Sequence, residues 1–150
     1  MPSILLVCTA NICRSPMGEA LLRARLAGLA ELQSCGTHAA SRGEPIDSRA
    51  AAALARRDLS LPKRWRSRRV QAGSLGGFDM ILAMDHDNLR ALRQICPPGL
   101  QDRVQLFMDQ VPGRAGDEVP DPYFGAPQGF DNVLDLLELG ARAIAQALRR

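Results

Sequence analysis

Two hydrophobic patterns follow one another along this chain: short unbroken apolar runs, and longer segments in which apolar residues recur at helical spacing. Residues 3–7 form an unbroken apolar run that is too short for a helix, which predicts a fully buried strand. Similar short runs predict further strands at residues 32–35, 78–83 and 103–107. Long segments separate these four predicted strands.

Between these runs, apolar residues recur at helical spacing. Residues 17–30 place several leucines on overlapping faces, and residues 47–57 form an alanine-rich segment. A third helix is predicted for residues 87–95, because the two prolines that follow cannot continue it. The last helix is predicted from residue 127 to the C-terminus.

This alternation predicts an α/β fold with three layers, in which helices cover both faces of a four-stranded parallel sheet. Ligands of such folds bind at the carboxyl ends of the strands. A length of 150 residues with 46% hydrophobic content suits one domain covering residues 1–150.

Composition narrows the setting. No apolar run has transmembrane length, and no basic leader precedes the first apolar stretch, so neither a membrane span nor a secretory signal is expected. The four cysteines lack a dense disulfide pattern, which favours a reducing compartment. We therefore expect a cytoplasmic protein without membrane contacts, and a monomer.

The most informative segment follows the first strand. Residues 8–15 read CTANICRS, so that Cys8 and Arg14 lie six positions apart, and Ser15 with Pro16 predicts a helix start with Ser15 as its N-cap. A loop between a strand end and a helix N-terminus directs several backbone N–H groups into one concavity. This segment, the nucleophile loop, is therefore predicted to bind an oxyanion.

The cysteine adds chemistry to that anion site. Backbone donors, a helix N-terminus and a guanidinium all stabilise a thiolate, so Cys8 is expected to be a nucleophile. Arg14 offers a planar fork that can bind two phosphoryl oxygens, and the Ser15 hydroxyl can donate to the sulfur. The alternative is that Cys8 is a buried thiol at a strand end and that Arg14 is a surface charge.

Further motifs extend the pattern. Residues 7–16 (VCTANICRSP) and 119–125 (VPDPYFG) resemble the nucleophile loop and acid loop of the bacterial low-molecular-weight protein tyrosine phosphatases. Residues 34–37, 43–49 and 78–85 match that family in order and approximate spacing. The resemblance covers essentially the whole chain and implies a sheet order of 2-1-3-4 and hydrolysis of phosphotyrosine through a phosphocysteine.

The resemblance also implies roles for individual residues. Cys8 is the nucleophile, Arg14 holds the phosphoryl group, and Asp121 is the general acid and then the general base. The rest of the phosphate-binding loop is Thr9, Ala10, Asn11, Ile12, Cys13 and Ser15. Tyr123 and Phe124 match one wall of the substrate pocket, to which Ile12 also contributes.

The role of Asp121 also agrees with its chemistry. Expelling a phenolate, whose conjugate acid has a pKa of about 10, benefits from a positioned proton donor, which typically supplies about 10²–10⁴ in rate. Pro120 and Pro122 restrict the backbone on either side. The alternative roles are a turn aspartate for Asp121 and hydrophobic loop anchors for Tyr123 and Phe124.

Two positions depart from the family pattern. Ala40 aligns where many relatives carry an aromatic residue in the opposite wall. His38 lies close by and could substitute for that residue, but a surface histidine is the better interpretation. Trp65 aligns where many relatives carry a histidine bonded to the loop asparagine. We expect Asn11 to adopt a left-handed backbone conformation and to keep Ser34 as its other partner.

The remaining cysteines divide into two groups. By resemblance, Cys13 can form a reversible disulfide with Cys8 under peroxide and so protect it from irreversible oxidation. Cys35 and Cys96 are expected to be buried thiols without a reactive role.

Residues 56–69 contain seven basic residues and one acidic residue. Nucleic-acid binding is disfavoured, because the net charge is only +3 and aromatic residues are absent apart from Trp65. A solvated face that steers acidic, phosphorylated partners towards the active site is the better interpretation.

Other functions on the same loop stay open. An arsenate reductase would need a further cysteine pair, and Cys96 stands alone. An arginine-phosphate phosphatase would carry threonine at position 12, where this chain has Ile12. A non-catalytic phosphotyrosine-binding module would need neither Cys8 nor Asp121.

No cofactor or metal is implied, since His38 and His86 lack the spacing of metal ligands. The resemblance implies a tyrosine-phosphorylated protein as partner, such as a bacterial tyrosine kinase of polysaccharide export.

Overall fold

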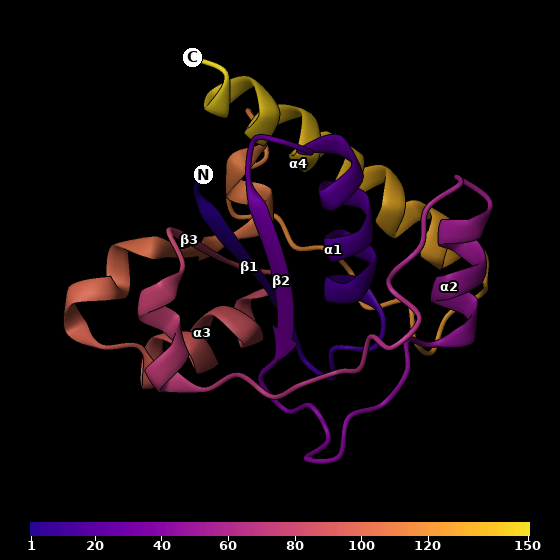
Figure 1. Cartoon of the computed structure of the whole chain (residues 1–150), viewed down its shortest axis with the longest axis horizontal. Coiled ribbons are helices and arrows are strands. Elements are labelled where there is room, and N and C mark those ends of the chain that lie inside the picture. Colours follow the sequence, from indigo (N-terminus) through magenta and orange to yellow (C-terminus); the bar gives the residue numbers. More distant parts are fainter.

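Four short strands form a parallel sheet in the order β2-β1-β3-β4, which confirms the order implied by the resemblance (Figure 1). The computed structural model describes all residues from 1 to 150. The strands are β1 (Ser3–Cys8), β2 (Glu31–Gly36), β3 (Met80–Ala83) and β4 (Val104–Leu106).

Four α-helices and three short 3₁₀ segments connect and cover the strands. The helices are α1 (Arg14–Arg25), α2 (Ser48–Ala55), α3 (His86–Ile95) and α4 (Gln128–Leu148). The 3₁₀ segments are η1 (Ala72–Gly77), η2 (Pro98–Arg103) and η3 (Phe107–Gln110). None of these helices combines the length and the apolarity that crossing a membrane requires.

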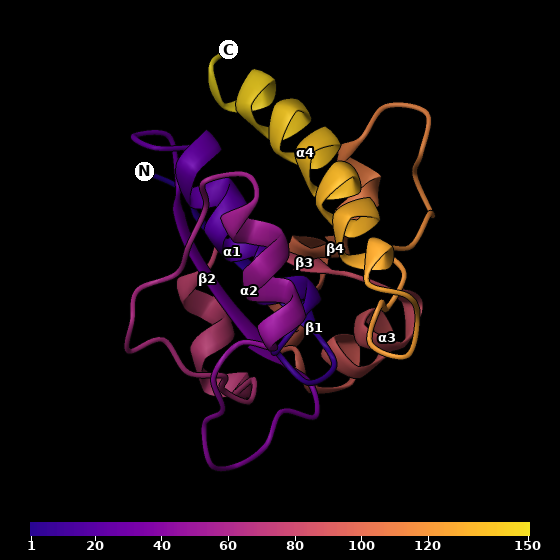
Figure 2. The same cartoon turned by 90° about the vertical axis from the view of Figure 1, so that its right-hand side faces the viewer.

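The sheet separates two apolar clusters, because successive side chains of a strand point to opposite faces. Ile4 and Leu6 of β1 pack in the larger cluster, beneath α1, α2 and α4 (Figure 2). Leu5 and Val7 pack in the smaller cluster, with residues of α3 and η1. Both faces are therefore covered, as predicted for a three-layer α/β fold.

The contact between α4 and η3, the segment directly after β4, depends on one small residue. A Cβ atom at Gly140 would lie 2.1 Å from the Phe107 ring, which is fully buried. Only glycine lets the helix approach this ring so closely.

The predicted elements all exist, but two details of the first helix were wrong. The helix begins at Arg14, after Cys13 as its N-cap, so Ser15 lies inside the first turn and is not the cap. The Ser15 hydroxyl contacts Cys8 and Asn11 instead, because it faces the interior. The helix ends at Arg25, and Gly28 turns the chain with a φ of 79°.

The carboxyl ends of the strands lie at one end of the molecule, opposite both chain termini (Figure 1). The nucleophile loop, the 37–47 loop after β2 and the start of α3 meet there. The 119–125 segment joins them, since the Val119 N–H donates to the carbonyl of Met84 just after β3 at 2.8 Å. This is the end at which the sequence predicted a ligand site.

Candidate active site

Cys8 is the last residue of β1, and its thiol lies at the floor of a pocket of about 350 Å³. The residue is 3% exposed. Its Sγ lies 2.9 Å from the Ser15 hydroxyl oxygen, which comes from the first turn of α1. Strand and helix thus hold sulfur and hydroxyl in hydrogen-bond contact across the nucleophile loop.

Asn11 shapes that loop from within. Its φ of 57° confirms the predicted left-handed conformation, which asparagine tolerates better than most residues. Its amide nitrogen donates to the hydroxyls of Ser15 at 2.7 Å and Ser34 at 3.0 Å, so the predicted Ser34 contact is confirmed. Its amide oxygen accepts from the backbone N–H of Arg68 at 3.0 Å.

A buried carboxylate supports this network from behind. The Ser34 hydroxyl donates to Glu19 at 2.7 Å, and Glu19 is only 3% exposed. Trp65 donates its indole N–H to the same Glu19 oxygen at 3.2 Å, and Arg23 pairs with the other oxygen at 2.8 Å. The Trp65 ring therefore reaches the loop through Glu19 and Ser34 rather than through Asn11.

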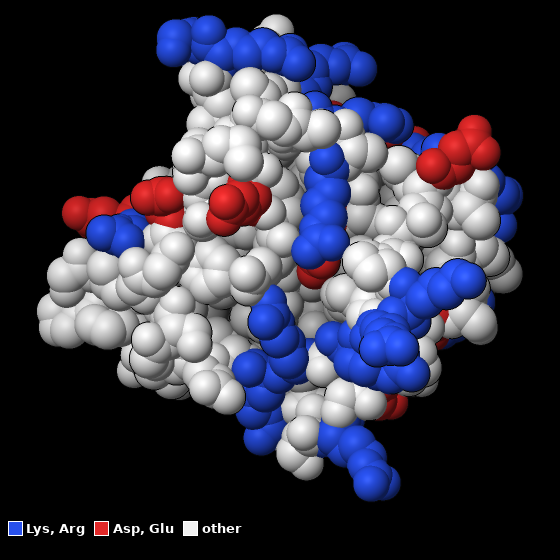
Figure 3. Space-filling view, in the orientation of Figure 1, with Lys and Arg blue, Asp and Glu red and all other residues white.

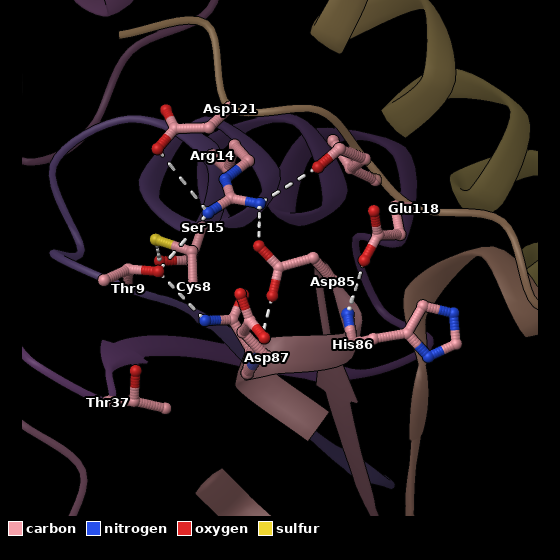
Figure 4. A network of polar contacts seen from close by, with 12 residues as sticks. Cys8, Thr9, Arg14, Ser15, Thr37, Asp85, His86, Asp87, Glu118 and Asp121 are labelled. Carbon is pink, nitrogen blue, oxygen red and sulfur yellow. Dashed lines mark hydrogen bonds and ion pairs between the residues drawn. The ribbon is translucent and has the colours of Figure 1, made fainter. Parts of the chain in front are cut away.

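Arg14 is the most heavily restrained side chain of the site (Figure 4). It is 3% exposed, so its interpretation as a surface charge was wrong. Its guanidinium donates to the Asp85 carboxylate at 2.7 Å and to the Val119 carbonyl at 3.0 Å. It also contacts the Thr9 hydroxyl at 3.5 Å, so the end of β3, the acid loop and the nucleophile loop all hold it in one orientation.

Asp121 lies at the mouth of the same pocket. One carboxylate oxygen is 3.8 Å from the Arg14 guanidinium, and the other accepts the Tyr123 backbone N–H at 3.1 Å. The side chain is half exposed, at 51%. Asp121 can therefore exchange a proton with solvent while it faces the group that Arg14 binds.

The outer part of the pocket is aromatic on one side. Tyr123 and Phe124 meet edge to face with ring centroids 4.9 Å apart, and Phe124 is 94% exposed. The Arg49 guanidinium lies 5.0 Å from the Tyr123 ring centre and donates to the Tyr123 carbonyl at 2.9 Å. Together these contacts hold an aromatic wall above Cys8.

The pocket brings together almost every residue that the sequence singled out. Its lining consists of Cys8, Thr9, Ala10, Asn11, Ile12, Cys13, Arg14, Glu44, Asp121, Tyr123 and Phe124. Ser15 contacts Cys8 from beneath the loop. Ala40 and His38 do not line the pocket, so His38 does not replace the missing aromatic wall.

The other thiols are held in the protonated form. Burial, followed by the negative charge of Asp47, raises the pKa of Cys13 to about 12. Burial also raises the pKa of Cys35 to about 12 and raises that of Cys96. Cys35 and Cys96 are both buried, as predicted.

Three acidic residues of the site were not assigned a role from the sequence. Asp85 orients Arg14, Glu19 anchors the loop network, and Glu44 lines the pocket. Asp85 and Glu44 stand within motifs noted for the resemblance, which was the one available signal. Glu19 had no signal, because a glutamate in a helix is ordinarily exposed.

A cysteine and an arginine in a strand–loop–helix phosphate site, faced by an aspartate, define a class of phosphatase. The sequence profile described as "Low molecular weight phosphotyrosine protein phosphatase" matches residues 3–150. The chain belongs to this family.

Individual relatives agree with that assignment. A low molecular weight protein-tyrosine-phosphatase of Streptomyces coelicolor is 38% identical over 151 residues, covering 95% of this chain and 91% of the relative. A low molecular weight phosphotyrosine phosphatase of Vibrio cholerae has a similar crystal structure, with a TM-score of 0.90, 32% identity and coverage of 100% and 98% of the two chains.

An arginine phosphatase, YwlE of Geobacillus stearothermophilus, also has this fold. Its TM-score is 0.90 at 26% identity, over 99% of this chain and 94% of the other. The fold is therefore shared by enzymes with different substrates, and the substrate of this enzyme has to be inferred from the residues that line its pocket.

Proposed function

We propose that this enzyme hydrolyses phosphotyrosine on a protein, with Cys8 as nucleophile, Arg14 as phosphate ligand and Asp121 as general acid and base. The observation that supports it best is that these three side chains, from the end of β1, the start of α1 and the 119–125 segment, face one pocket. A protein that only binds phosphotyrosine would need neither the thiol nor the exposed acid.

The first half-reaction transfers the phosphoryl group to sulfur. The Cys8 thiolate attacks phosphorus, the bond from phosphorus to the tyrosine oxygen breaks, and Asp121 gives its proton to that oxygen. Negative charge on the three equatorial oxygens is stabilised by loop amides, the α1 N-terminus and Arg14. Because Asp85 and the Val119 carbonyl already hold Arg14, little reorganisation is needed.

The second half-reaction releases phosphate. Asp121, now a carboxylate, takes a proton from water as the water oxygen attacks phosphorus, and the bond from phosphorus to sulfur breaks. The Ser15 hydroxyl, 2.9 Å from the sulfur, stabilises the departing thiolate by donating a hydrogen bond to it. The enzyme is then ready for another turnover.

The pocket favours a phenyl ester. Tyr123 and Phe124 offer ring faces and edges on which a phenyl group can pack. Ile12 adds an apolar surface at the loop, where an arginine phosphate would bring a polar guanidinium that needs hydrogen-bond partners. This observation favours phosphotyrosine over phosphoarginine.

An arsenate reductase is the weaker alternative. Such an enzyme passes oxidation from one thiol to another. Cys96 packs in the smaller apolar cluster at the end of α3, and the Cys8 pocket does not include it. Cys13 is the one other thiol that lines the pocket, and it is proposed as the partner of Cys8 in a reversible disulfide.

The finer points of the setting are proposals as well. A thiol nucleophile beside a second thiol works only while it is reduced, which favours the cytoplasm. The resemblance to bacterial members favours a tyrosine kinase of polysaccharide export as the phosphorylated partner. Capture of phosphoproteins from the native cell by a Cys8→Ser or Asp121→Ala variant tests the proposed partner.

Two variants and three substrates test the proposed function. We expect the wild type to hydrolyse p-nitrophenyl phosphate and a phosphotyrosine peptide but not a phosphoarginine peptide. Cys8→Ser should abolish turnover yet still bind phosphate. Asp121→Ala should slow the phosphotyrosine peptide by about 10²–10⁴ and p-nitrophenyl phosphate less, because nitrophenolate leaves without a proton. Faster hydrolysis of phosphoarginine than of phosphotyrosine would overturn the proposal.

A further inference from the structure

Four arginines outside the catalytic pocket gather beside the exposed edge of the sheet. Arg66, Arg68 and Arg69 come from the extended segment that runs past β2, and Arg42 comes from the 37–47 loop. All four are exposed. Figure 3 shows blue side chains spread down this side of the molecule, with few red ones among them. We call these four residues the arginine face.

The positive charge of this face is not neutralised within the chain. Arg68 donates to the Ser34 carbonyl and the Gln33 amide oxygen, Arg69 to the Ala39 carbonyl, and Arg66 to a backbone carbonyl. These acceptors are neutral, so they orient the guanidinium groups of Arg66, Arg68 and Arg69 without cancelling their charge. Two arginines nearby differ in this respect.

The comparison within the same segment makes the difference plain. Arg56 pairs with Asp131 at 2.9 Å, and Arg57 pairs with Asp135 at 2.7 Å, both on α4. Of the seven basic residues between 56 and 69, the two nearest α4 are thus neutralised by carboxylates. The four residues of the arginine face form no ion pair with a carboxylate.

Two hollows lie between these side chains. One, of about 280 Å³, is lined by Arg23, Arg66 and Arg68 with Gln33, Trp65 and Glu19. The other, of about 230 Å³, lies beside Arg68 and Arg69 and has an apolar floor that includes Leu5, Val70 and Leu75. Glu19 is the one acid in either lining, and it is buried and already paired with Arg23.

The arginine face is joined to the catalytic pocket by hydrogen bonds. The Ser67 N–H donates to the Glu44 carbonyl at 2.8 Å, and the Glu44 N–H donates to the Ser67 hydroxyl at 2.9 Å. Glu44 lines the Cys8 pocket. A peptide that leaves the pocket beside Glu44 therefore reaches Arg66 or Arg68 within roughly three to six extended residues.

We propose that the arginine face is a docking surface for an acidic segment of the phosphoprotein substrate; this rests on the proposed function. The segment binds with its phosphotyrosine over Cys8 and its Asp and Glu residues against Arg42, Arg66, Arg68 and Arg69. The Glu44 carboxylate repels acids next to the phosphotyrosine, so the acidic residues that count lie several positions away.

Nucleic acid fits this surface less well. Single-stranded binding needs aromatic faces on which bases stack, and the one aromatic ring here, Trp65, is half-buried and bonded to Glu19. Acidic side chains need only the guanidinium forks, which the neutral acceptors hold ready. Charge complementarity therefore favours an acidic protein segment.

The test compares two phosphotyrosine peptides. In one, four Asp or Glu residues follow three to six positions after the phosphotyrosine; in the other, Asn and Gln replace them. The wild type should show a higher kcat/KM for the acidic peptide, by roughly 3- to 10-fold at low salt, and the ratio should fall towards one as salt is raised. Using the ratio cancels any general change in activity.

Variants locate the effect. Arg42→Ala combined with Arg66→Ala removes half of the positive charge of the arginine face and should lower the ratio towards one. The matched control is Arg142→Ala combined with Arg149→Ala, which removes the same charge from the C-terminal end of α4 and should leave the ratio unchanged.

Three outcomes would overturn the docking proposal: equal kcat/KM for the two peptides in the wild type, an equal loss of the ratio in both double variants, or competition by single-stranded RNA but not by an acidic peptide. In each case, continued hydrolysis of the phosphotyrosine peptide without acidic residues would show that the proposed catalytic function stands. Loss of that activity as well would instead indicate that the proposed function is wrong.

Discussion

Trp65 donates its indole N–H to the carboxylate of Glu19 at 3.2 Å, although the two residues lie 46 positions apart in the chain. This contact ties the segment after α2 to the first helix, and through Ser34 and Asn11 it reaches the nucleophile loop. A residue that departs from the family pattern thus takes part in supporting the loop.

Replacing this tryptophan should weaken both the fold and the reaction. Trp65→Phe keeps most of the ring but removes the donor, so a buried carboxylate loses one partner. We expect the free energy of unfolding to fall by about 1–3 kcal/mol, as for hydrogen bonds to charged groups, and kcat to fall several-fold. Urea unfolding and p-nitrophenyl phosphate hydrolysis measure these changes. Trp65→His, which restores an N–H donor, should recover part of both; equal loss in both variants would mean that ring packing alone matters.

Asp85 should control the orientation of Arg14. Asp85→Ala removes the 2.7 Å ion pair and leaves Asp121, 3.8 Å away, as the nearest carboxylate to the guanidinium. Because a misplacement of about 1 Å can cost 10²-fold in rate, we expect kcat to fall by about 10- to 100-fold. Asp85→Asn, which keeps an acceptor oxygen, should lose less. A kcat within about twofold of the wild type for Asp85→Ala would contradict this role.

Disulfide formation between Cys8 and Cys13 should depend steeply on pH. The raised pKa of Cys13, at about 12, leaves it protonated at neutral pH, and only its thiolate attacks an oxidised Cys8. Below that pKa the thiolate fraction rises about tenfold per pH unit. We therefore expect the rate of disulfide formation after a peroxide pulse, followed by mass spectrometry, to rise by about tenfold between pH 7 and pH 8. A rate independent of pH, or stable sulfinic acid on Cys8 at pH 8, would argue against this pairing.

Asp47 should stabilise α2 in a pH-dependent way. It caps the helix through the Arg49 N–H at 2.8 Å, and hydrogen bonds from Arg49 lower its pKa. A lowered folded-state pKa gives stability that is complete above the ordinary carboxyl value of about 4 and is lost as the pH falls through the folded value.

Two substitutions separate the cap from the charge. Asp47→Ala should cost about 0.5–2 kcal/mol at pH 7. Asp47→Asn still caps the helix, so its smaller cost should vanish as the pH falls through the lowered folded-state pKa of Asp47, where the wild-type side chain is also neutral. Thermal unfolding at several acidic pH values would show this convergence; a difference that stays constant over the whole acid range in which the protein is folded would exclude a role for the charge.

The sequence predicted the elements that depend on local pattern. The apolar run of β1 and the motif from Cys8 to Arg14 were enough to place the nucleophile loop, and the resemblance placed Asp121 beside it. The start of α1 was harder to predict, because serine is a common N-cap residue but the Ser15 hydroxyl contacts Cys8 instead. The Gly-rich η1 segment has no hydrophobic period and was not predicted.

Contacts between distant residues could not be predicted. The partner of Arg14 lies 71 positions away, and nothing local to Asp85 indicates which cation it meets. Glu19 looks like an ordinary exposed helix residue until β2 and Trp65 cover it. Such pairs depend on the packing of whole elements, which a single sequence reveals only through its resemblance to a family.

One measurement bears most directly on the covalent role of Cys8. The Asp121→Ala variant lacks the base that activates water, and nitrophenolate leaves without a proton. Mixed with p-nitrophenyl phosphate and quenched with denaturant within the first turnover, it should therefore carry one phosphoryl group on the peptide that contains Cys8, as read by mass spectrometry. Phosphate released without any phosphorylated Cys8, or a phosphoryl group on another residue, would contradict the account.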